Sequence, residues 1–167
     1  MITTTTITCN YAQYYRSNGS QWYVDKPRVY SGKDSAEKTR KSRMRFPISC
    51  GDGRPIYITD LTLYLYRNEG GSAGQTMKIS AESFSASQSV SISKSKGAKN
   101  IAITNTAFFT GLAERNGSNQ YLQISSSGEE AQFVGYSTSD YAGKEPKLHI
   151  TWDYAGSSVS SSETDRY

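Results

Sequence analysis

The sequence predicts an all-β domain, and more closely an antiparallel β-sandwich of the jelly-roll type. About ten short segments alternate apolar and polar residues, which is typical of half-buried strands. Turn-forming residues separate these segments at intervals of roughly 8 to 15 residues. No segment keeps a helical period for more than three turns, although a parallel sheet would need helices between its strands. Together these observations favour a β-sandwich or barrel.

The composition is that of one domain with an aromatic core. The chain has 167 residues, and its 13 Tyr, 5 Phe and 2 Trp compensate for a low aliphatic content. We expect residues 1–154 to form a single β-sandwich. Residues 155–167 (AGSSVSSSETDRY) have the composition of a flexible tail that tethers the domain to a longer chain or an assembly partner. Neither a membrane-spanning stretch of about 20 apolar residues nor a secretion signal is recognisable, so no membrane insertion is predicted.

Five strands are predicted in the first third of the chain. The clearest places Met44, Phe46 and Ile48 on one face and Arg43 and Arg45 on the other. This pattern predicts a half-buried strand with a cationic outer side. The five predicted strands are Ile2–Cys9, Tyr11–Arg16, Trp22–Val24, Arg28–Ser31 and Arg43–Ile48.

The strongest strand signal in the chain covers Ile56–Arg67. Leucines at every second position mark its core face, while Tyr64 and Tyr66 lie on the opposite face. The Gly-rich stretch 68–74 (NEGGSAG) ends this strand, and Thr76–Phe84 follows with a similar alternation. We therefore expect the two strands to pair as an antiparallel hairpin.

The remaining part of the chain has weaker signals. Residues 85–99 are rich in Ser and Lys and are predicted to form a long loop or a poorly specified edge strand. Residues 101–110 begin with the pattern of a strand. The last three strands are predicted at Tyr121–Ser125, Gln132–Ser137 and Pro146–Tyr154, with Ser-Gly and Tyr-Ala-Gly turns between them.

Four segments carry a resemblance to a known family. They are YAQYYRSNGSQWYVDKPRVYSG, RKSRMRFPI, PIYITDLTLYLYRN and QFVGYSTSDYAGKEPKLHITWDY, and they cover roughly residues 8–154. In this order they resemble the DNRLRE-type jelly rolls, which are similar to carbohydrate-binding modules. Such domains occur on bacterial surface and secreted proteins and in virion proteins of phages. The matching positions are Ser31, Gly32, Arg45, Phe46, the segment 58–64, Tyr136, Ser137, Pro146, Leu148 and Ile150.

The resemblance implies a non-catalytic structural or attachment domain. We expect a component of a phage virion, in its tail, a fibre or a capsid decoration, that binds a surface glycan or a particle partner. Other virion subunits or further copies of the chain would be its assembly partners, and the extracellular particle its location. Two alternatives stay open. One is a carbohydrate-binding module of a bacterial surface or polysaccharide-processing protein, at the cell surface or secreted, and the other is the jelly-roll shell protein of a small virus.

The sequence offers no catalytic constellation. A Ser-His-Asp triad would need His149, the only histidine, which alternation places opposite Leu148 and Ile150 as an exposed or inter-strand residue. Glu129 and Glu130 are adjacent in a turn and point apart, so they do not converge as the carboxylates of a glycosidase do. We therefore predict no enzymatic activity and no catalytic residue.

Metal ligands are scarce as well. One His and two Cys are too few for a typical zinc or iron site, so no metal site and no cofactor is predicted. A structural Ca²⁺ would be compatible with the fold, and loop carboxylates would supply its oxygen ligands. The candidate donors, Asp25, Asp34, Asp52 and Asp140, form no spaced motif.

The two cysteines, Cys9 and Cys50, lie at the ends of predicted strands. They could form a disulfide or remain two unrelated, half-buried thiols. The missing secretion signal favours free thiols.

Positive charge is concentrated in one region. Residues 26–45 contain eight Lys and Arg residues against two acidic ones, a local charge of +6, which leaves −2 for the rest of the chain because the total is +4. Such a cluster either keeps a sheet face soluble or contacts an anionic glycopolymer, teichoic acid for example, or an assembly partner. Nucleic acid is disfavoured because no nucleic-acid-binding motif accompanies the charge. The predicted anionic-partner patch consists of Lys38, Arg40, Lys41, Arg43 and Arg45.

Aromatic side chains supply a second candidate site, because sugars stack their apolar faces on exposed rings. Trp22 and Tyr23 lie in a polar, loop-like segment and are predicted to be exposed. Tyr64 and Tyr66 form a shallow platform on a sheet face unless the second sheet or residues 85–99 cover them. Trp152 shares its face with apolar neighbours and is predicted to be in the core. Ligand binding is therefore predicted at Trp22, Tyr23, Tyr64 and Tyr66.

Overall fold

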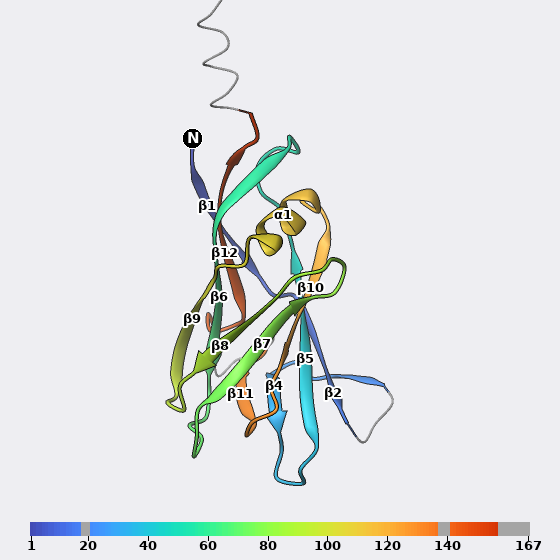
Figure 1. The fold of residues 1–167 in the computed structure, drawn as a ribbon, viewed down its shortest axis with the longest axis vertical. Coiled ribbons are helices and arrows are strands. Elements are labelled where there is room, and N and C mark those ends of the chain that lie inside the picture. Colours follow the sequence, from blue (N-terminus) through green and yellow to red (C-terminus); the bar gives the residue numbers. More distant parts are fainter. Residues whose placement is uncertain (18–20, 137–140, 157–167) are drawn as a thin grey trace, which may run out of the picture.

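The computed structural model describes residues 1–17, 21–136 and 141–156 and shows an antiparallel β-sandwich of the jelly-roll type, as predicted (Figure 1). The chain order is β1 (Thr3–Thr8), β2 (Tyr11–Arg16), β3 (Trp22–Val24), β4 (Arg28–Lys33), β5 (Thr39–Pro47), β6 (Ile56–Arg67), β7 (Gln75–Ala81), β8 (Ser87–Ile92), β9 (Gly97–Ile103), α1 (Thr106–Glu114), β10 (Asn119–Ser125), β11 (Ala131–Val134) and β12 (Lys147–Tyr154).

The strands form two layers. In the first sheet β1 pairs with β12, β12 with β6, and β6 with β9, while β11 pairs with the last residue of β6. In the second sheet the order is β3, β2, β5, β10, β7, β8. Strand β4 connects the two, because Arg28–Ser31 pair with β11 and Gly32–Lys33 pair with β5. At this crossing Gly32 has a φ of +110°, a conformation that side chains with a Cβ rarely adopt.

The core lies between the two sheets and follows the period-2 alternation. Every second residue of β6 from Leu61 to Arg67 is buried, and so are Ser42, Met44 and Phe46 of β5. Trp152 of β12 is 5% exposed, which confirms its predicted place in the core. Burial of these apolar faces supplies the main driving force for folding.

The predicted pairing of Ile56–Arg67 with Thr76–Phe84 is wrong. Strand β6 belongs to the first sheet, whereas β7 pairs with β10 and β8 in the second. Residues 68–74 are therefore a crossing between the layers, because β9 and β12 already occupy the two edges of β6. Of the two alternatives for residues 85–99, the edge strand is confirmed and the long loop is wrong, because these residues form β8 at the edge of the second sheet and the start of β9.

The single helix of the described residues, α1, follows β9 directly. The side chain of Asn105 caps its first turn by accepting a hydrogen bond from the N–H of Ala107 at 3.0 Å. Phe108 and Leu112 point from α1 into the core. Within the part of the chain that the structure describes, no helix has the length and hydropathy needed to cross a bilayer.

Both cysteines are free thiols, which settles the choice between a disulfide and two separate cysteines. Cys9 and Cys50 are 3% and 1% exposed, so they are more deeply buried than expected. Burial away from water raises the pKa of Cys9 to about 12, and it also raises the pKa of Cys50. Both thiols are therefore neutral and unreactive in the folded protein.

Strand β12 ends at Tyr154, where the domain was predicted to end. Residues 157–167 of the expected tail lie outside the described residues, and so do Ser137, the predicted end of one strand, and Asp140, one of the four candidate calcium donors.

Candidate functional site

A cationic row runs along the outer face of the second sheet. Successive side chains of a strand point to opposite faces, so Lys41, Arg43 and Arg45 of β5 point outward while the residues between them are buried. All three outward side chains are half-buried. Three of the five residues of the predicted anionic-partner patch thus share one face.

Aromatic residues of the neighbouring strands stand beside this row. In the register of β2 with β5, Tyr15 lies opposite Lys41 and Tyr11 lies opposite Arg45. Trp22 of β3 lies opposite Tyr15, and Tyr121 of β10 lies opposite Arg45. We call this surface the basic–aromatic face and define it by Tyr11, Tyr15, Trp22, Lys41, Arg43, Arg45 and Tyr121.

Arg43 is at the centre of the basic–aromatic face and is held by several neighbours. Its guanidinium carbon lies 4.4 Å from the ring centroid of Trp22 and 5.0 Å from that of Tyr121. Its Nε donates to Oε1 of Gln13 at 2.8 Å, and its Nη1 lies 3.4 Å from Oε1 of Glu82. The guanidinium therefore fixes the position of the Trp22 indole, and its charge is largely compensated by Glu82.

Lys41 and Arg45 are less constrained. The ammonium nitrogen of Lys41 lies 5.3 Å and 5.5 Å from the ring centroids of Tyr15 and Trp22. The guanidinium carbon of Arg45 lies 5.0 Å from the ring of Tyr11, and its Nε donates to Asn10 Oδ1 at 2.8 Å. Among residues 1–17, 21–136 and 141–156, no carboxylate forms an ion pair with either side chain. Their remaining N–H groups are free to bind an anionic ligand.

The other two residues of the predicted patch lie elsewhere. Lys38 is exposed in the turn between β4 and β5. Arg40 precedes Lys41 by one residue, so it points to the opposite face of β5, where it packs over the rings of Tyr14 and Tyr30. The patch therefore divides into an outer group of three cations and two separate residues.

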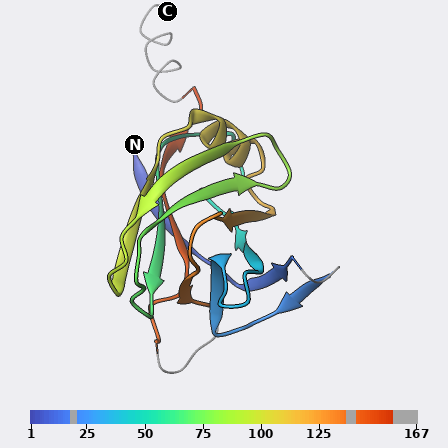
Figure 2. The same ribbon diagram turned by 60° about the horizontal axis from the view of Figure 1, so that its bottom comes forward.

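The predicted pair Trp22 and Tyr23 lies in strand β3 and not in a loop, and it is divided in the same way. Tyr23 is exposed as predicted, whereas Trp22 is half-buried because cationic and aromatic side chains pack against its ring. Because they are neighbours on β3, only Trp22 belongs to the basic–aromatic face. Tyr23 stacks on Tyr14 on the other side, with ring centroids 5.4 Å apart. Figure 2 shows that β2 and β3 (blue) extend away from the rest of the fold.

Tyr64 and Tyr66 lie on the outer face of the first sheet, far in topology from Trp22. Lys147 lies 5.0 Å from the ring of Tyr64, and Lys144 lies 5.0 Å from the ring of Tyr66. Tyr141 also packs against Tyr66. The segment 141–147 therefore covers part of the predicted tyrosine platform, whereas Ala98 of the segment 85–99 lies beside Tyr66 in the neighbouring strand β9.

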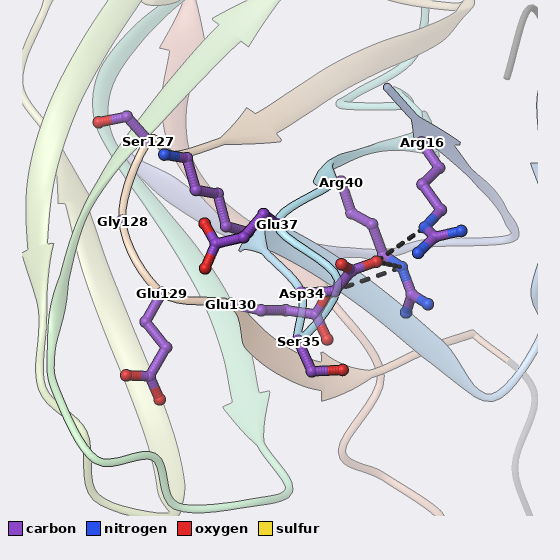
Figure 3. A pocket seen from close by; sticks show the side chains of 10 residues that line it. Arg16, Asp34, Ser35, Glu37, Arg40, Ser127, Gly128, Glu129 and Glu130 are labelled. Atoms are coloured by element: carbon purple, nitrogen blue, oxygen red, sulfur yellow. Dashed lines mark hydrogen bonds and ion pairs between the residues drawn. The ribbon is translucent and has the colours of Figure 1, made fainter. Parts of the chain in front are cut away.

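A pocket lies at another place, at the end of β4 and β5 where the two sheets meet. It has a volume of about 710 Å³. Figure 3 shows that Arg16, Asp34, Arg40 and Glu130 converge there, while Glu129 points away from them. Arg16 Nε donates to Asp34 Oδ2 at 2.7 Å, and Arg40 Nε lies 3.6 Å from a carboxylate oxygen of both Asp34 and Glu130.

The carboxylates of this pocket have opposite environments. The hydrogen bond from Arg16 lowers the pKa of Asp34 to about 2, and the backbone N–H groups of Ala36 and Lys38 contribute. Burial raises the pKa of Glu130 above its usual value of 4.5, and the attraction of Arg40 only partly offsets this. These contacts make the pocket an ion-pair network that holds the β4–β5 turn in place.

Replacing Glu130 with Gln is expected to stabilise the protein at neutral pH. A carboxyl with a raised pKa binds its proton more tightly in the folded state than in the unfolded state, so stability falls as the pH rises from the usual pKa to the raised one. Glu130→Gln removes this loss of stability, because a glutamine side chain does not ionise. Its thermal midpoint should exceed that of the wild type at pH 7, and the difference should shrink below about pH 4. A lower midpoint at pH 7 would show that the contact with Arg40 outweighs the cost of burial.

The remaining candidate residues have structural contacts. Nδ1 of His149 lies 3.0 Å from Oγ1 of Thr6 in the neighbouring strand, which confirms the predicted inter-strand position. Asp25 accepts a hydrogen bond from the Tyr30 hydroxyl, and Asp52 pairs with Arg54. The described residues contain no group of three or more His, Cys, Asp or Glu side chains placed to hold a metal ion.

Sequence reasoning missed four residues of the site. Tyr11, Tyr15 and Tyr121 belong to the basic–aromatic face, and Glu82 compensates its central cation. The alternation within each strand gives the face on which these residues lie, but only the pairing of β2 and β10 with β5 brings them together.

Comparisons with known proteins add little to the site. No protein-family model matches the chain, and no curated protein matches it. Among solved structures, an exo-beta-1,3-galactanase from Phanerochaete chrysosporium with galactose is similar over 83% of this chain, at 13% identity and a TM-score of 0.38. A Glu-to-Gln variant of that enzyme with beta-1,3-galactotriose matches over 78% of this chain, at 11% identity and a TM-score of 0.35. This chain spans 29% and 30% of the lengths of those two chains. A likeness at this level assigns no activity, ligand or subsite.

Proposed function

We propose that this domain is a non-catalytic attachment domain that binds an acidic surface polysaccharide through the basic–aromatic face. The observation that carries the proposal is the convergence of Trp22 from β3 with Lys41 and Arg45 from β5 on one outer sheet face. Aromatic rings stack on the apolar faces of sugars, and the free cationic groups beside them pair with carboxylates or phosphates. Aromatic rings alone would not select charged sugars over neutral ones, and cationic groups alone would not select a sugar over another anion.

The carboxylates of the protein support a non-catalytic role. Asp34 accepts hydrogen bonds from Arg16 and from two backbone N–H groups, and Glu129 accepts them from Ser72. Each of these acidic groups is therefore engaged in holding a loop. The lowered pKa of Asp34 keeps its carboxylate ionised near neutral pH, so it is unsuited to act as a general acid.

The setting that we propose is a phage virion, in its tail, a fibre or a capsid decoration, with other subunits or further copies of the chain as partners. The resemblance to virion-borne jelly rolls supports this setting. A shallow, open face binds weakly as a single copy, and many copies on one particle would raise the total affinity by avidity. The alternatives are a carbohydrate-binding module of a bacterial protein and the shell protein of a small virus.

The direct test is the double variant Lys41→Gln/Arg45→Gln. Binding to hyaluronan, an acidic polysaccharide, is measured by calorimetry at several salt concentrations. The double variant is expected to lose about tenfold or more in affinity and to show a flatter salt dependence, because it loses two free cations. The matched control is Lys144→Gln/Lys147→Gln, which removes two cations beside Tyr66 and Tyr64 on the other sheet.

Each outcome separates one function from the others. An equal loss in both double variants would contradict the basic–aromatic face as the site. Preference of the wild type for neutral dextran over hyaluronan would favour the carbohydrate-binding module, since stacking alone would then determine binding. Tighter binding to single-stranded DNA than to either polysaccharide, with a steep salt dependence, would favour the shell protein.

A further inference from the structure

We infer that Glu82 restricts the basic–aromatic face to polymers whose charged sugars alternate with uncharged ones, and so excludes densely charged polyanions. This inference rests on the proposed function and names the class of its ligand. Glu82 directly follows β7, next to the central strands of the second sheet, and its side chain is 22% exposed. It is therefore close enough to the surface to act on a ligand that lies across the face.

The carboxylate of Glu82 has two partners on the basic–aromatic side of the sheet. Its Oε1 lies 3.4 Å from Nη1 of Arg43, and its Oε2 accepts a hydrogen bond from Nε2 of Gln123 at 2.9 Å. Gln13 binds the same guanidinium from the other side. Arg43 thus has most of its donors satisfied within the protein, and it serves as a positioning residue for Trp22 and not as a free contact cation.

The free cations are consequently the outer two of the row. Lys41 and Arg45 are four residues apart on an extended strand, which places their Cα atoms about 13 Å apart. Arg43, compensated by Glu82, lies between them on β5, and its guanidinium carbon lies 4.4 Å from the ring centroid of Trp22, which stands beside the row on β3. Along β5 the face therefore presents a free cation, a cation that is paired with a carboxylate, and a second free cation, in this order, with the indole of Trp22 beside them.

This order matches a polymer with an uncharged sugar between two charged ones. The two anionic groups would pair with Lys41 and Arg45, and the apolar face of the middle sugar would stack beside Trp22. A polymer that carries a charge on every unit would place one anion next to Glu82. Contacts between like charges are unfavourable in interfaces, so Glu82 weakens the binding of densely charged polymers.

The experiment compares two carboxylated polysaccharides that differ in charge density. Hyaluronan carries one carboxylate on every second sugar, and polygalacturonate carries one on every sugar. The ratio of their affinities is measured for the wild type and for Glu82→Gln. The matched control is Asp60→Asn, which removes the same charge from an exposed residue on the outer face of the first sheet.

We expect Glu82→Gln to gain about 3- to 10-fold in affinity for polygalacturonate, with little change for hyaluronan. Its salt dependence on polygalacturonate should steepen by about one additional charge, because Arg43 is released to bind the polymer. Asp60→Asn should leave the ratio of affinities as in the wild type. Melting curves of the variants serve to confirm that each is folded.

Two different failures can be told apart. If the wild type binds neither polysaccharide, the proposed function is wrong. If the wild type binds hyaluronan but Glu82→Gln leaves the ratio unchanged, or Asp60→Asn shifts it equally, the proposed function stands and the role of Glu82 is overturned.

Discussion

Removal of the Trp22 indole is expected to weaken polysaccharide binding by roughly 30-fold, or about 2 kcal/mol, because tryptophans are among the side chains that contribute most to the affinity of a binding surface. Trp22 offers the largest ring of the basic–aromatic face and also contacts Lys41 and Arg43. Trp22→Ala therefore removes the stacking surface and loosens both cations. The affinity for hyaluronan, measured by calorimetry, provides the test.

The neighbouring residue supplies a stringent control. Tyr23→Ala removes an aromatic ring from the same short strand, but that ring stacks on Tyr14 on the opposite face. Its affinity for hyaluronan should stay within about twofold of the wild type, since the lost ring is outside the site. If Tyr23→Ala loses as much as Trp22→Ala, the hairpin as a whole and not its outer face is responsible for binding.

Arg67→Ala is expected to have the largest effect on stability, a loss of about 3 kcal/mol of unfolding free energy. Arg67 is only 1% exposed. Its Nε donates to the carbonyl of Glu69 at 3.2 Å and its Nη1 to the carbonyl of Ser93 at 2.7 Å. The substitution leaves these carbonyls without their partner and opens a cavity, and each effect costs about 1–3 kcal/mol. Burial of the charged guanidinium is itself unfavourable, so its removal offsets part of this loss.

Thermal unfolding provides the measurement, and a fall of the midpoint by roughly 10 °C is expected for a domain of this size. Arg54→Ala is the control, because Arg54 is exposed and pairs with Asp52 at the surface. Its midpoint should remain close to that of the wild type. A midpoint of Arg67→Ala as high as that of Arg54→Ala would show that the loops containing Glu69 and Ser93 do not depend on Arg67.

Strand positions could be predicted from the sequence because alternation is a local property. The segment predicted at Ile56–Arg67 is β6 without change, and the outward direction of Arg43 and Arg45 is correct. The same alternation assigns Arg67 to the leucine face of β6, which is a signal for a buried cation. Its partners, however, are carbonyls of two loops whose meeting depends on the whole fold.

Strand pairing could not be predicted because it is decided by distant parts of the chain. The Gly-rich segment 68–74 has the composition of a hairpin turn, yet β9 and β12, of which β12 begins only at Lys147, take both edges of β6. The candidate site depends on pairing in the same way. Trp22 and Lys41 were each identified, but their convergence on one face follows from the registers of β3 with β2 and of β2 with β5.

The central claim is that the outer face of the second sheet is the binding surface, and the two tryptophans of the chain report on it directly. Trp22 lies on that face, whereas Trp152 is buried and its Nε1 donates to Thr5 Oγ1 at 2.8 Å. In a ¹⁵N-labelled sample titrated with hyaluronan, the indole N–H signal of Trp22 should shift or broaden while that of Trp152 stays in place. Binding that leaves the Trp22 signal unchanged would contradict the claim.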